Sequence, residues 1–200
     1  MSFIPIIRIM AKILKIGPKE FEKIVQGKIS SFVAKKITAA KLAYSPLNPE
    51  ERDDLILKIV EILADDSIPF SGAHRKKQWQ KGWNETLHEY KKKPEDELLV
   101  PKHFYKYTVG RIRGDFVKLS SKNFELNISD AIIYWVIEKY LRGARDVFDF
   151  GCGTGHNLLK IREINKTANI TGLDWVSSSQ KTVQLIAKNT NDKKNVCKKV

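Results

Sequence analysis

Hydrophobic residues recur at helical spacing through the first third of the chain. Residues 3–16 place apolar side chains on one helical face and basic ones on the other, which predicts an amphipathic helix. Gly17 and Pro18 end this helix and begin a second one, whose apolar stripe extends over residues 21–37. A basic amphipathic helix more often packs against its own protein, but it can also make a weak peripheral contact with an anionic membrane.

Two further helical segments are predicted before residue 101. Asn48 and Pro49 have the residue types of a helix N-cap and a first helical position. Trp79 and Trp83 are four residues apart, so they would share one face of a helix within residues 69–101. Aromatic rings among basic side chains can stack on a base or a sugar. The alternative is that the tryptophans cover the core while the lysines remain in solvent.

The pattern changes after residue 128. A helix, capped by Asn127 or Ser129, is predicted to end at Gly143. An alternation of strands and helices then follows: strand 146–150, helix 157–165, strand 169–175, helix 177–189 and a third strand from residue 195. For the second of these helices, Ser177 and Gln180 fit a capping box. This order is typical of a doubly wound α/β fold with a parallel sheet, its first strand buried on both faces.

The sequence therefore predicts an α/β protein with two regions. Residues 1–128 would form a helical cap or substrate region, and residues 129–200 the N-terminal part of a Rossmann-like cofactor domain. Only about two βα units fit after residue 146, so we expect the doubly wound sheet to be cut short. The chain would then be the N-terminal part of a longer protein, and the alternatives are a decayed gene or a fragment completed by another chain. Its first strand would be an exposed apolar edge.

Composition narrows the class of protein. The chain has 200 residues, 42% of them hydrophobic, but no apolar run long enough to span a membrane, so we expect a globular protein. Two cysteines form no disulfide framework, which favours a cytoplasmic location. A net charge of +13 favours anionic partners or simply a soluble, lysine-rich surface. Neither a P-loop nor a cysteine or histidine metal motif occurs, so no metal site is expected.

A cluster of three glycines follows the first predicted strand, in the stretch "VFDFGCGTGHN". Gly151, Gly153 and Gly155 would let the backbone bend sharply and approach a ligand closely, since no Cβ atom stands in the way. The ligand side of such a sheet is the carboxyl end of its strands. Asp174 ends the second predicted strand at that edge, where its carboxylate can accept hydrogen bonds from both ribose hydroxyls. The pattern indicates a nucleoside-bearing cofactor.

The spacing distinguishes between two such cofactors. A dinucleotide fingerprint is G-x-G-x-x-G, but His156 occupies the position of the third glycine here. Asp149 lies two residues before the first glycine, where an acid would repel a pyrophosphate and attract a cation. S-adenosylmethionine carries a sulfonium and an ammonium group and no phosphate. The pattern therefore favours S-adenosylmethionine over NAD.

The motifs "DFGCGTG" and "GLDW" resemble the first two motifs of class I S-adenosylmethionine-dependent methyltransferases, over residues 129–200. The resemblance implies a seven-stranded Rossmann-like sheet. It also implies a cofactor site made of the loop residues Gly151, Cys152, Gly153, Thr154 and Gly155, with Asp149 near the methionine end, Asp174 at the ribose and Trp175 against the adenine. Cys152 and Thr154 would contribute mainly backbone groups.

The function implied is methyl transfer from S-adenosylmethionine to an acceptor, which we expect to be a small molecule or a sugar. A nucleic-acid acceptor is less favoured. The segment with Trp79 and Trp83 is a hypothetical lining of the acceptor site. The catalytic base, the atom methylated and the oligomeric state are not indicated by the sequence. The alternative function is a non-catalytic, basic binding or scaffold protein with a vestigial cofactor motif.

Overall fold

The computed structural model describes residues 12–68, 73–105 and 107–199, which divide into two compact units. Unit 1 comprises residues 1–69 and 105–128, and unit 2 comprises residues 70–104 and 129–200. The second end of unit 1 coincides with the predicted boundary at residue 128. Residues 70–104, which the sequence assigned to the N-terminal region, belong instead to the unit that carries the glycine motif.

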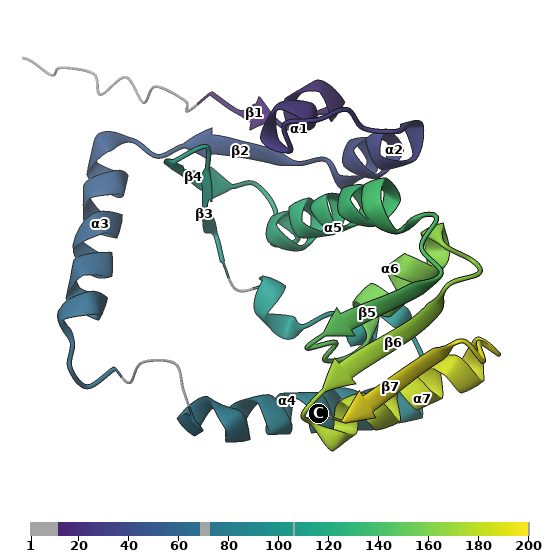
Figure 1. The fold of residues 1–200 in the computed structure, drawn as a ribbon. Coiled ribbons are helices and arrows are strands. Elements are labelled where there is room, and N and C mark those ends of the chain that lie inside the picture. The colour runs from purple at the N-terminus through teal and green to yellow at the C-terminus, as the bar shows by residue number, and fades with distance from the viewer. Residues whose placement is uncertain (1–11, 69–72, 106, 200) are drawn as a thin grey trace, which may run out of the picture. The chain divides into compact units, whose positions relative to one another are not determined.

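Unit 1 contains a four-stranded antiparallel sheet, so the prediction of a purely helical N-terminal region was wrong. Its strands are β1 (Leu14–Lys15), β2 (Ala43–Pro46), β3 (Val109–Ile112) and β4 (Asp115–Leu119), in the order β1-β2-β4-β3 (Figure 1). Residues 14 and 15 therefore form a strand rather than the end of a helix. The rest of that predicted helix, residues 3–11, lies outside the described residues, as does its proposed membrane contact.

A two-residue turn joins β3 to β4. Ile112 pairs with Asp115, and the two residues between them, Arg113 and Gly114, have φ angles of +53° and +95°. Positive φ at both central residues is the geometry of a type I′ turn, whose twist matches that of the paired strands. The turn usually contains Asn-Gly or Asp-Gly, and the less common Arg-Gly pair explains why the hairpin was missed.

Within residues 12–68, three helices accompany the strands β1 and β2. The helices α1 (Pro18–Ile24) and α2 (Ser31–Ala40) bury Phe21 and Val33. The single second helix predicted from the apolar stripe over residues 21–37 is therefore two helices, and the second one has Ser30 as its N-cap. The helix α3 (Pro49–Ala64) begins as predicted, because Asn48 and Glu51 form a capping box. None of the residues of α3 is buried, so its apolar side chains remain on the surface of the unit.

Unit 2 has the predicted alternation of elements. The helix α4 (Ala73–Lys92) and the short 3₁₀ turns Asp96–Leu99 and Lys102–Tyr105 precede α5 (Phe124–Val136), which continues into a π-helical turn, Ile137–Leu141. Residues 124–128 of α5 belong to unit 1 and the rest of the helix to unit 2. Then follow β5 (Asp146–Phe150), α6 (His156–Ile164), β6 (Asn169–Asp174), α7 (Ser177–Asn189) and β7 (Asn195–Lys199). The helix α5 begins at Phe124, so neither Asn127 nor Ser129 is its N-cap.

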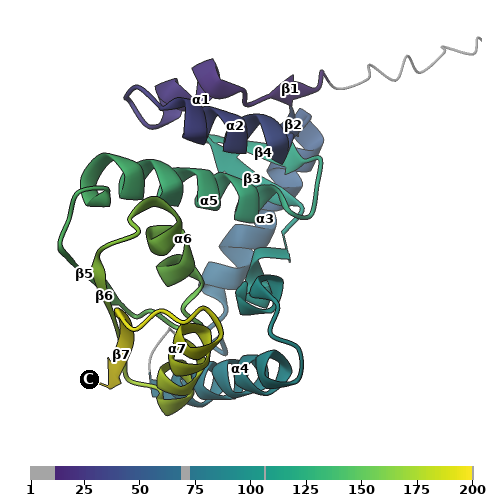
Figure 2. The same cartoon turned by 90° about the vertical axis from the view of Figure 1, so that its right-hand side faces the viewer.

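The three strands of unit 2 form a parallel sheet in the order β5-β6-β7. Figure 2 shows α6 and α7 on the same side of this sheet. On the other face, Phe148 and Phe150 of β5 are 59% and 78% exposed, and Val196 of β7 is also exposed. Within the described residues, β5 is therefore an edge strand with an apolar, uncovered face. The predicted exposed apolar edge is confirmed for these residues, and the covering of both faces expected of a doubly wound sheet is not seen in the described part of the chain.

The core of unit 2 lies between the sheet and its helices. Val147 and Ile170 of the strands pack there with Leu158 of α6 and Val183 of α7. A second, smaller cluster joins Tyr90 of α4 to Ile186 and Leu99. The helix α4 consequently packs along α7, beside which it is drawn in Figure 1.

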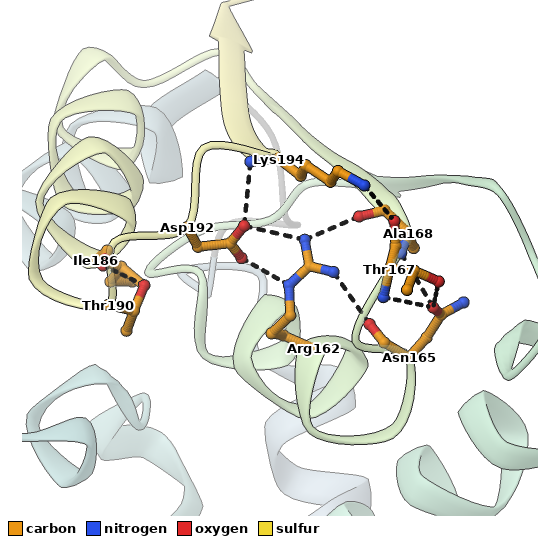
Figure 3. Close-up of polar contacts among 8 residues, drawn as sticks. All are labelled: Arg162, Asn165, Thr167, Ala168, Ile186, Thr190, Asp192 and Lys194. Carbon is orange, nitrogen blue, oxygen red and sulfur yellow. Dashed lines mark hydrogen bonds and ion pairs between the residues drawn. The ribbon is translucent and has the colours of Figure 1, made fainter.

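The side chain of Arg162 holds the turns of unit 2 together. Its guanidinium donates to both carboxylate oxygens of Asp192, at 2.6 and 3.2 Å, and to the carbonyl oxygens of Asn165 and Ala168 (Figure 3). Both Arg162 and Asp192 are largely buried. The planar guanidinium thus links the end of α6, the start of β6 and the α7–β7 turn, which fixes the spacing of the strands.

Candidate functional site

The glycine loop joins β5 to α6 at the carboxyl end of the sheet. Gly151, Gly153 and Gly155 have φ angles of +75°, +53° and +83°, a region that side chains with a Cβ disfavour. The backbone N–H groups of Gly151 and Cys152 both donate to the carbonyl oxygen of Leu173, at 2.7 and 3.2 Å. The loop is therefore held against the end of β6, the strand that carries the predicted acid.

Two of the glycines are also required by close packing. A Cβ on Gly155 would lie 2.9 Å from Cγ2 of Val183 and 3.2 Å from Cδ1 of Ile186, both on α7. A Cβ on Gly153 would lie 3.1 Å from the indole ring of Trp83. Gly151, by contrast, has open space at its Cβ position, so only its backbone conformation favours glycine.

Asp174 lies at the end of β6, beside the loop. One carboxylate oxygen accepts a 2.9 Å hydrogen bond from the backbone N–H of Gly153, and the other accepts a 2.8 Å hydrogen bond from that of Val176. The side chain is buried, with 3% of its residue surface exposed. Since a carboxylate offers about four lone-pair positions, two remain for other donors.

Asp149 is the second carboxylate of this region. It occupies β5 opposite Gly172, and its Oδ2 atom is buried with no hydrogen-bond partner among the described residues. Burial raises the pKa of Asp149, and the negative charge of Asp174 raises it further, while the ammonium of Lys160 acts in the opposite direction. Two carboxylates thus lie close enough to interact, in a setting that favours a cation.

The remaining predicted residues are held by contacts within unit 2. Thr154 is buried and its hydroxyl donates to the carbonyl oxygen of Leu99 at 2.5 Å. Cys152 is buried, with its Sγ atom 3.5 Å from that of Cys197 on β7. Trp175 is half-buried, and the ammonium of Lys76 lies 5.4 Å from the centre of its ring. All eight predicted residues are therefore near the carboxyl ends of β5 and β6.

The helix α4 and the turn that follows it supply neighbours that the sequence did not assign to this site. Trp83 packs on Gly153, and its ring centre lies 5.3 Å from that of Trp79. The spacing of the two tryptophans predicted a shared face, and this is confirmed. What the spacing could not show is that this face lies against the glycine loop, because the contact is between segments about seventy residues apart in the chain.

The start of α7 differs from its prediction. Its N-cap is Val176, and no side chain caps the helix, so the capping box of Ser177 and Gln180 was wrong. Asp174 takes over part of this role by accepting from the N–H of Val176. The hydroxyls of Ser178 and Ser179 are buried and have no hydrogen-bond partner in the described part of the chain.

A cavity of about 580 Å³ lies along α6 rather than at the glycine loop. His156, Lys160 and Glu163 of α6 line it together with residues such as Asp96 and Asp192. None of the eight predicted cofactor residues lines this cavity. Its mixture of acidic and basic side chains belongs largely to the ion pairs that join α6 to its neighbours, such as Lys160 with Asp130.

The described residues contain neither a metal-binding cluster nor a membrane-spanning helix. Among residues 12–68, 73–105 and 107–199, no three His, Cys, Asp or Glu side chains are grouped so that they could hold a metal ion. No helix in the described part of the chain has the length and apolar character needed to cross a membrane.

Comparison with known proteins gives a structural likeness but no match in sequence. No protein-family model matches the chain, and no curated protein is significantly similar to it in sequence. Among solved structures, the chain is similar to coclaurine N-methyltransferase bound to N-methylheliamine and SAH, with a TM-score of 0.38 and 13% identity. The match covers 77% of this chain and 47% of that one, so the chain spans about half the length of this methyltransferase.

Proposed function

We propose that this chain binds S-adenosylmethionine at the glycine loop and belongs to a class I methyltransferase with a Rossmann-like sheet. The observation that carries the proposal is the pair of carboxylates beside the loop. Asp149 has a buried oxygen without a hydrogen-bond partner among the described residues, and its pKa is raised partly by the charge of Asp174. A cationic ligand would neutralise the charge of the two carboxylates, and its ammonium group would supply a hydrogen-bond donor to the buried oxygen of Asp149.

The residues present fit this cofactor. Asp149 would face its ammonium or sulfonium group, Asp174 would accept from the ribose hydroxyls, and the half-buried ring of Trp175 would pack on the adenine. Gly151, Gly153 and Gly155 would let the backbone approach it, together with backbone groups of Cys152 and Thr154. A phosphate-bearing dinucleotide fits less well, because its negative charge would meet two carboxylates. When bound, S-adenosylmethionine supplies an activated methyl group on a positively charged sulfur.

The task of the chain's own residues is binding and orientation. The loop is fixed by its hydrogen bonds to Leu173 and Asp174, so its backbone groups have a defined position before the ligand arrives. Such preorganisation reduces the entropy lost on binding and holds reacting atoms in line. The packing of Trp83 on Gly153 would also keep water from one side of the loop.

For the methyl acceptor we propose a small molecule or a sugar. The support is the tryptophan pair on α4: Trp79 is 43% exposed and stacks at a tilt on Trp83, which contacts the loop. An exposed indole beside the cofactor site offers a flat apolar surface for a ring of the acceptor. In catalytically active protein, Trp79→Ala should lower the rate of methyl transfer more than it lowers the free energy of unfolding. Proportionate losses of rate and stability would exclude this role.

Binding of S-adenosylhomocysteine, the product form of the cofactor, tests the main proposal. The purified chain is heated with and without this ligand, and unfolding is followed by tryptophan fluorescence. A ligand at a hundred times its dissociation constant should stabilise the binding unit by about 2.7 kcal/mol. Asp174→Asn is the matched variant, because its amide oxygen can still accept one backbone hydrogen bond. The stabilisation should disappear in this variant while the unit still unfolds cooperatively.

A second function is supported by the surface of α4. Arg75, Lys76 and Lys77 are exposed on this helix, and the whole chain carries a net charge of +13. A non-catalytic protein that binds RNA or another polyanion would use such a surface. Its affinity for RNA should fall steeply with salt and should not respond to S-adenosylhomocysteine. Stabilisation by NAD instead would favour a nicotinamide enzyme and contradict both proposals.

A further inference from the structure

The two cysteines of the chain meet in the core of unit 2. Cys152 belongs to the glycine loop and Cys197 to β7, yet their Sγ atoms are only 3.5 Å apart. Both side chains are buried, with 5% and 9% of the residue surfaces exposed. The two thiols are 45 residues apart in the sequence, and a third strand separates their elements in the sheet.

Gly172 explains how the thiols reach each other across that strand. It lies on β6 directly between Asp149 of β5 and Cys197 of β7 in the register of the sheet. A Cβ on Gly172 would lie 2.7 Å from Sγ and 3.0 Å from Cβ of Cys152. The absence of a side chain on Gly172 therefore creates the space that the Cys152 side chain fills on its way to Cys197.

The surroundings of the pair are apolar, with charges nearby. Leu158, Ile170 and Val183 belong to the same core cluster as the two cysteines. The hydrogen bond between the sulfurs raises the pKa of Cys152 and lowers the pKa of Cys197, whereas the carboxylates of Asp149 and Asp174 raise the pKa of both thiols. Cys197 is thus the thiol that ionises first, and reaction is slowed by burial and by the two carboxylates.

We propose that Cys152 and Cys197 are a reversible oxidation site, at which a peroxide converts the thiol pair into an intramolecular disulfide between the glycine loop and β7. The sulfurs need to approach by roughly 1.5 Å to reach the disulfide bond length of about 2.05 Å. Both the glycine loop and β7 are held by hydrogen bonds, so moving either sulfur would disturb them. The loop is bonded to Leu173 and Asp174, and β7 is paired with β6.

The reaction balances with a peroxide as the oxidant. The thiolate of Cys197 attacks one peroxide oxygen, the O–O bond breaks, and the departing hydroxide takes a proton to form water. The thiolate of Cys152 then attacks the sulfur of the resulting sulfenic acid and displaces its hydroxyl group, which leaves as a second water. The two thiols lose two protons and two electrons in total, and hydrogen peroxide is reduced to two waters.

A consequence for ligand binding rests on the proposed function. Since Cys152 lies between two loop glycines, pulling its sulfur toward β7 shifts the backbone that would contact the cofactor. The affinity for S-adenosylhomocysteine should then fall about tenfold, as expected when closing the bond leaves modest strain in the loop. A reducing thiol such as dithiothreitol should restore it.

The experiment treats the whole chain with hydrogen peroxide, blocks remaining thiols with an alkylating agent, and maps the digested peptides without reduction. The expected result is a linked pair of peptides containing Cys152 and Cys197, formed in the monomer and lost on reduction. Cys197→Ser is the matched variant: it should yield no linked peptide, and Cys152 should be recovered as a free thiol or a sulfenic acid. Gly172→Ala should lower the yield in any sample that remains folded.

Separate oxidation of the two cysteines, or linkage only between two chains, would overturn the proposal. The mapping does not depend on cofactor binding, so its outcome is independent of the proposed function. If reduced protein fails to bind S-adenosylhomocysteine while the disulfide forms, the function is refuted and the oxidation site stands. If the disulfide forms and the affinity is unchanged, the site stands but its effect on binding is refuted.

Discussion

The sheets of the two units are assembled from very different parts of the chain. In unit 2, β5, β6 and β7 are adjacent in the sheet in their sequence order, and one helix separates each pair. In unit 1, β2 (Ala43–Pro46) pairs with β4 (Asp115–Leu119), and two of the four strands come from before residue 47. Closing such distant segments costs chain entropy before any contact is gained, so unit 1 depends on non-local pairing.

An ion pair from each unit shows a second difference, which is how deeply the pair is buried. Arg162 of unit 2 is largely buried and bonds Asp192 and two carbonyl groups, so it is part of the core architecture. Lys118 of unit 1 reaches Glu51 at 3.0 Å, but both side chains are substantially exposed. We infer that the buried pair of Arg162 and Asp192 stabilises unit 2 more than the exposed pair of Lys118 and Glu51 stabilises unit 1, because solvent screens the exposed pair.

The units can be followed separately in solution. All four tryptophans, Trp79, Trp83, Trp135 and Trp175, belong to unit 2. Tryptophan fluorescence therefore reports on unit 2, and circular dichroism reports on both units together. Fluorescence can therefore isolate the unfolding of unit 2 from that of the whole chain.

The largest effect is expected for Gly155→Ala. Its φ of +83° and the 2.9 Å approach to Val183 together predict a loss of about 3 kcal/mol in the free energy of unfolding. Gly151→Ala is the matched control, because it has a similar φ but open space, and it should cost about 1 kcal/mol. Urea unfolding followed by fluorescence measures both. Equal losses would show that packing on α7 contributes nothing.

Two variants, each lacking one ion pair, compare the units directly. Arg162→Ala should destabilise unit 2 by about 3 kcal/mol, since it leaves Asp192 largely buried without its cation. Lys118→Ala should destabilise unit 1 by less than about 0.5 kcal/mol, because its pair is exposed. The first change should move the fluorescence transition, and the second should barely alter the transition seen by circular dichroism. Similar effects would contradict the contrast between the units.

Asp149→Asn should separate stability from binding. The pKa of Asp149 is higher in the folded state than in the unfolded state. The protein is therefore most stable, with respect to this group, at pH below the unfolded pKa. This stability is lost as the pH rises through the folded pKa, because the side chain then becomes charged in the folded protein. At neutral pH, the variant removes this buried charge and should be more stable than the parent, with a weaker fall in stability between acid and neutral pH. It should also lose stabilisation by S-adenosylhomocysteine.

Asp146→Asn is the control for that change. It lies on the same strand but is exposed, so it should leave both ligand stabilisation and the pH profile close to those of the parent. Fluorescence-detected melts from pH 4 to pH 8 make the comparison. A less stable Asp149→Asn at neutral pH would contradict the assigned sign, and retained binding would contradict its role at the cofactor.

The smallest effect is expected on the uncovered face of the parallel sheet. Phe148→Thr and Phe150→Thr should each change the stability of unit 2 by less than about 0.5 kcal/mol, because both side chains are exposed. Val147→Ala, on the same strand but with its side chain in the core, should cost about 2 kcal/mol. Chemical unfolding at low protein concentration measures these differences. A large loss from either phenylalanine change would show that this face is covered in solution.

The part of the fold that the sequence predicted well is the part with local signals. The bounds of β5, α6, β6, α7 and β7 follow from apolar periodicity and from the glycines after β5. Asn48 marked the start of α3 for the same reason. The strands of unit 1 were missed because each has only two to five residues, and because their partners lie far away in the sequence.

Neighbours of the candidate site were harder to predict than its motif. The glycines and Asp174 are close to one another in a βα turn and the next strand, so their spacing alone brings them together. Trp83 and Leu99 belong to segments far from the loop, and only packing of α4 on α7 places them against Gly153 and Thr154.

By itself, the sequence determined the order of elements in residues 129–200 and the positive-φ glycine loop, because both follow from short-range patterns of side-chain size and polarity. Tertiary structure alone decided which segments share a sheet, that an oxygen of Asp149 is buried without a partner among the described residues, and that Cys152 meets Cys197 over Gly172. These features depend on contacts between residues distant in the chain. Their free energies arise only when the whole core has formed.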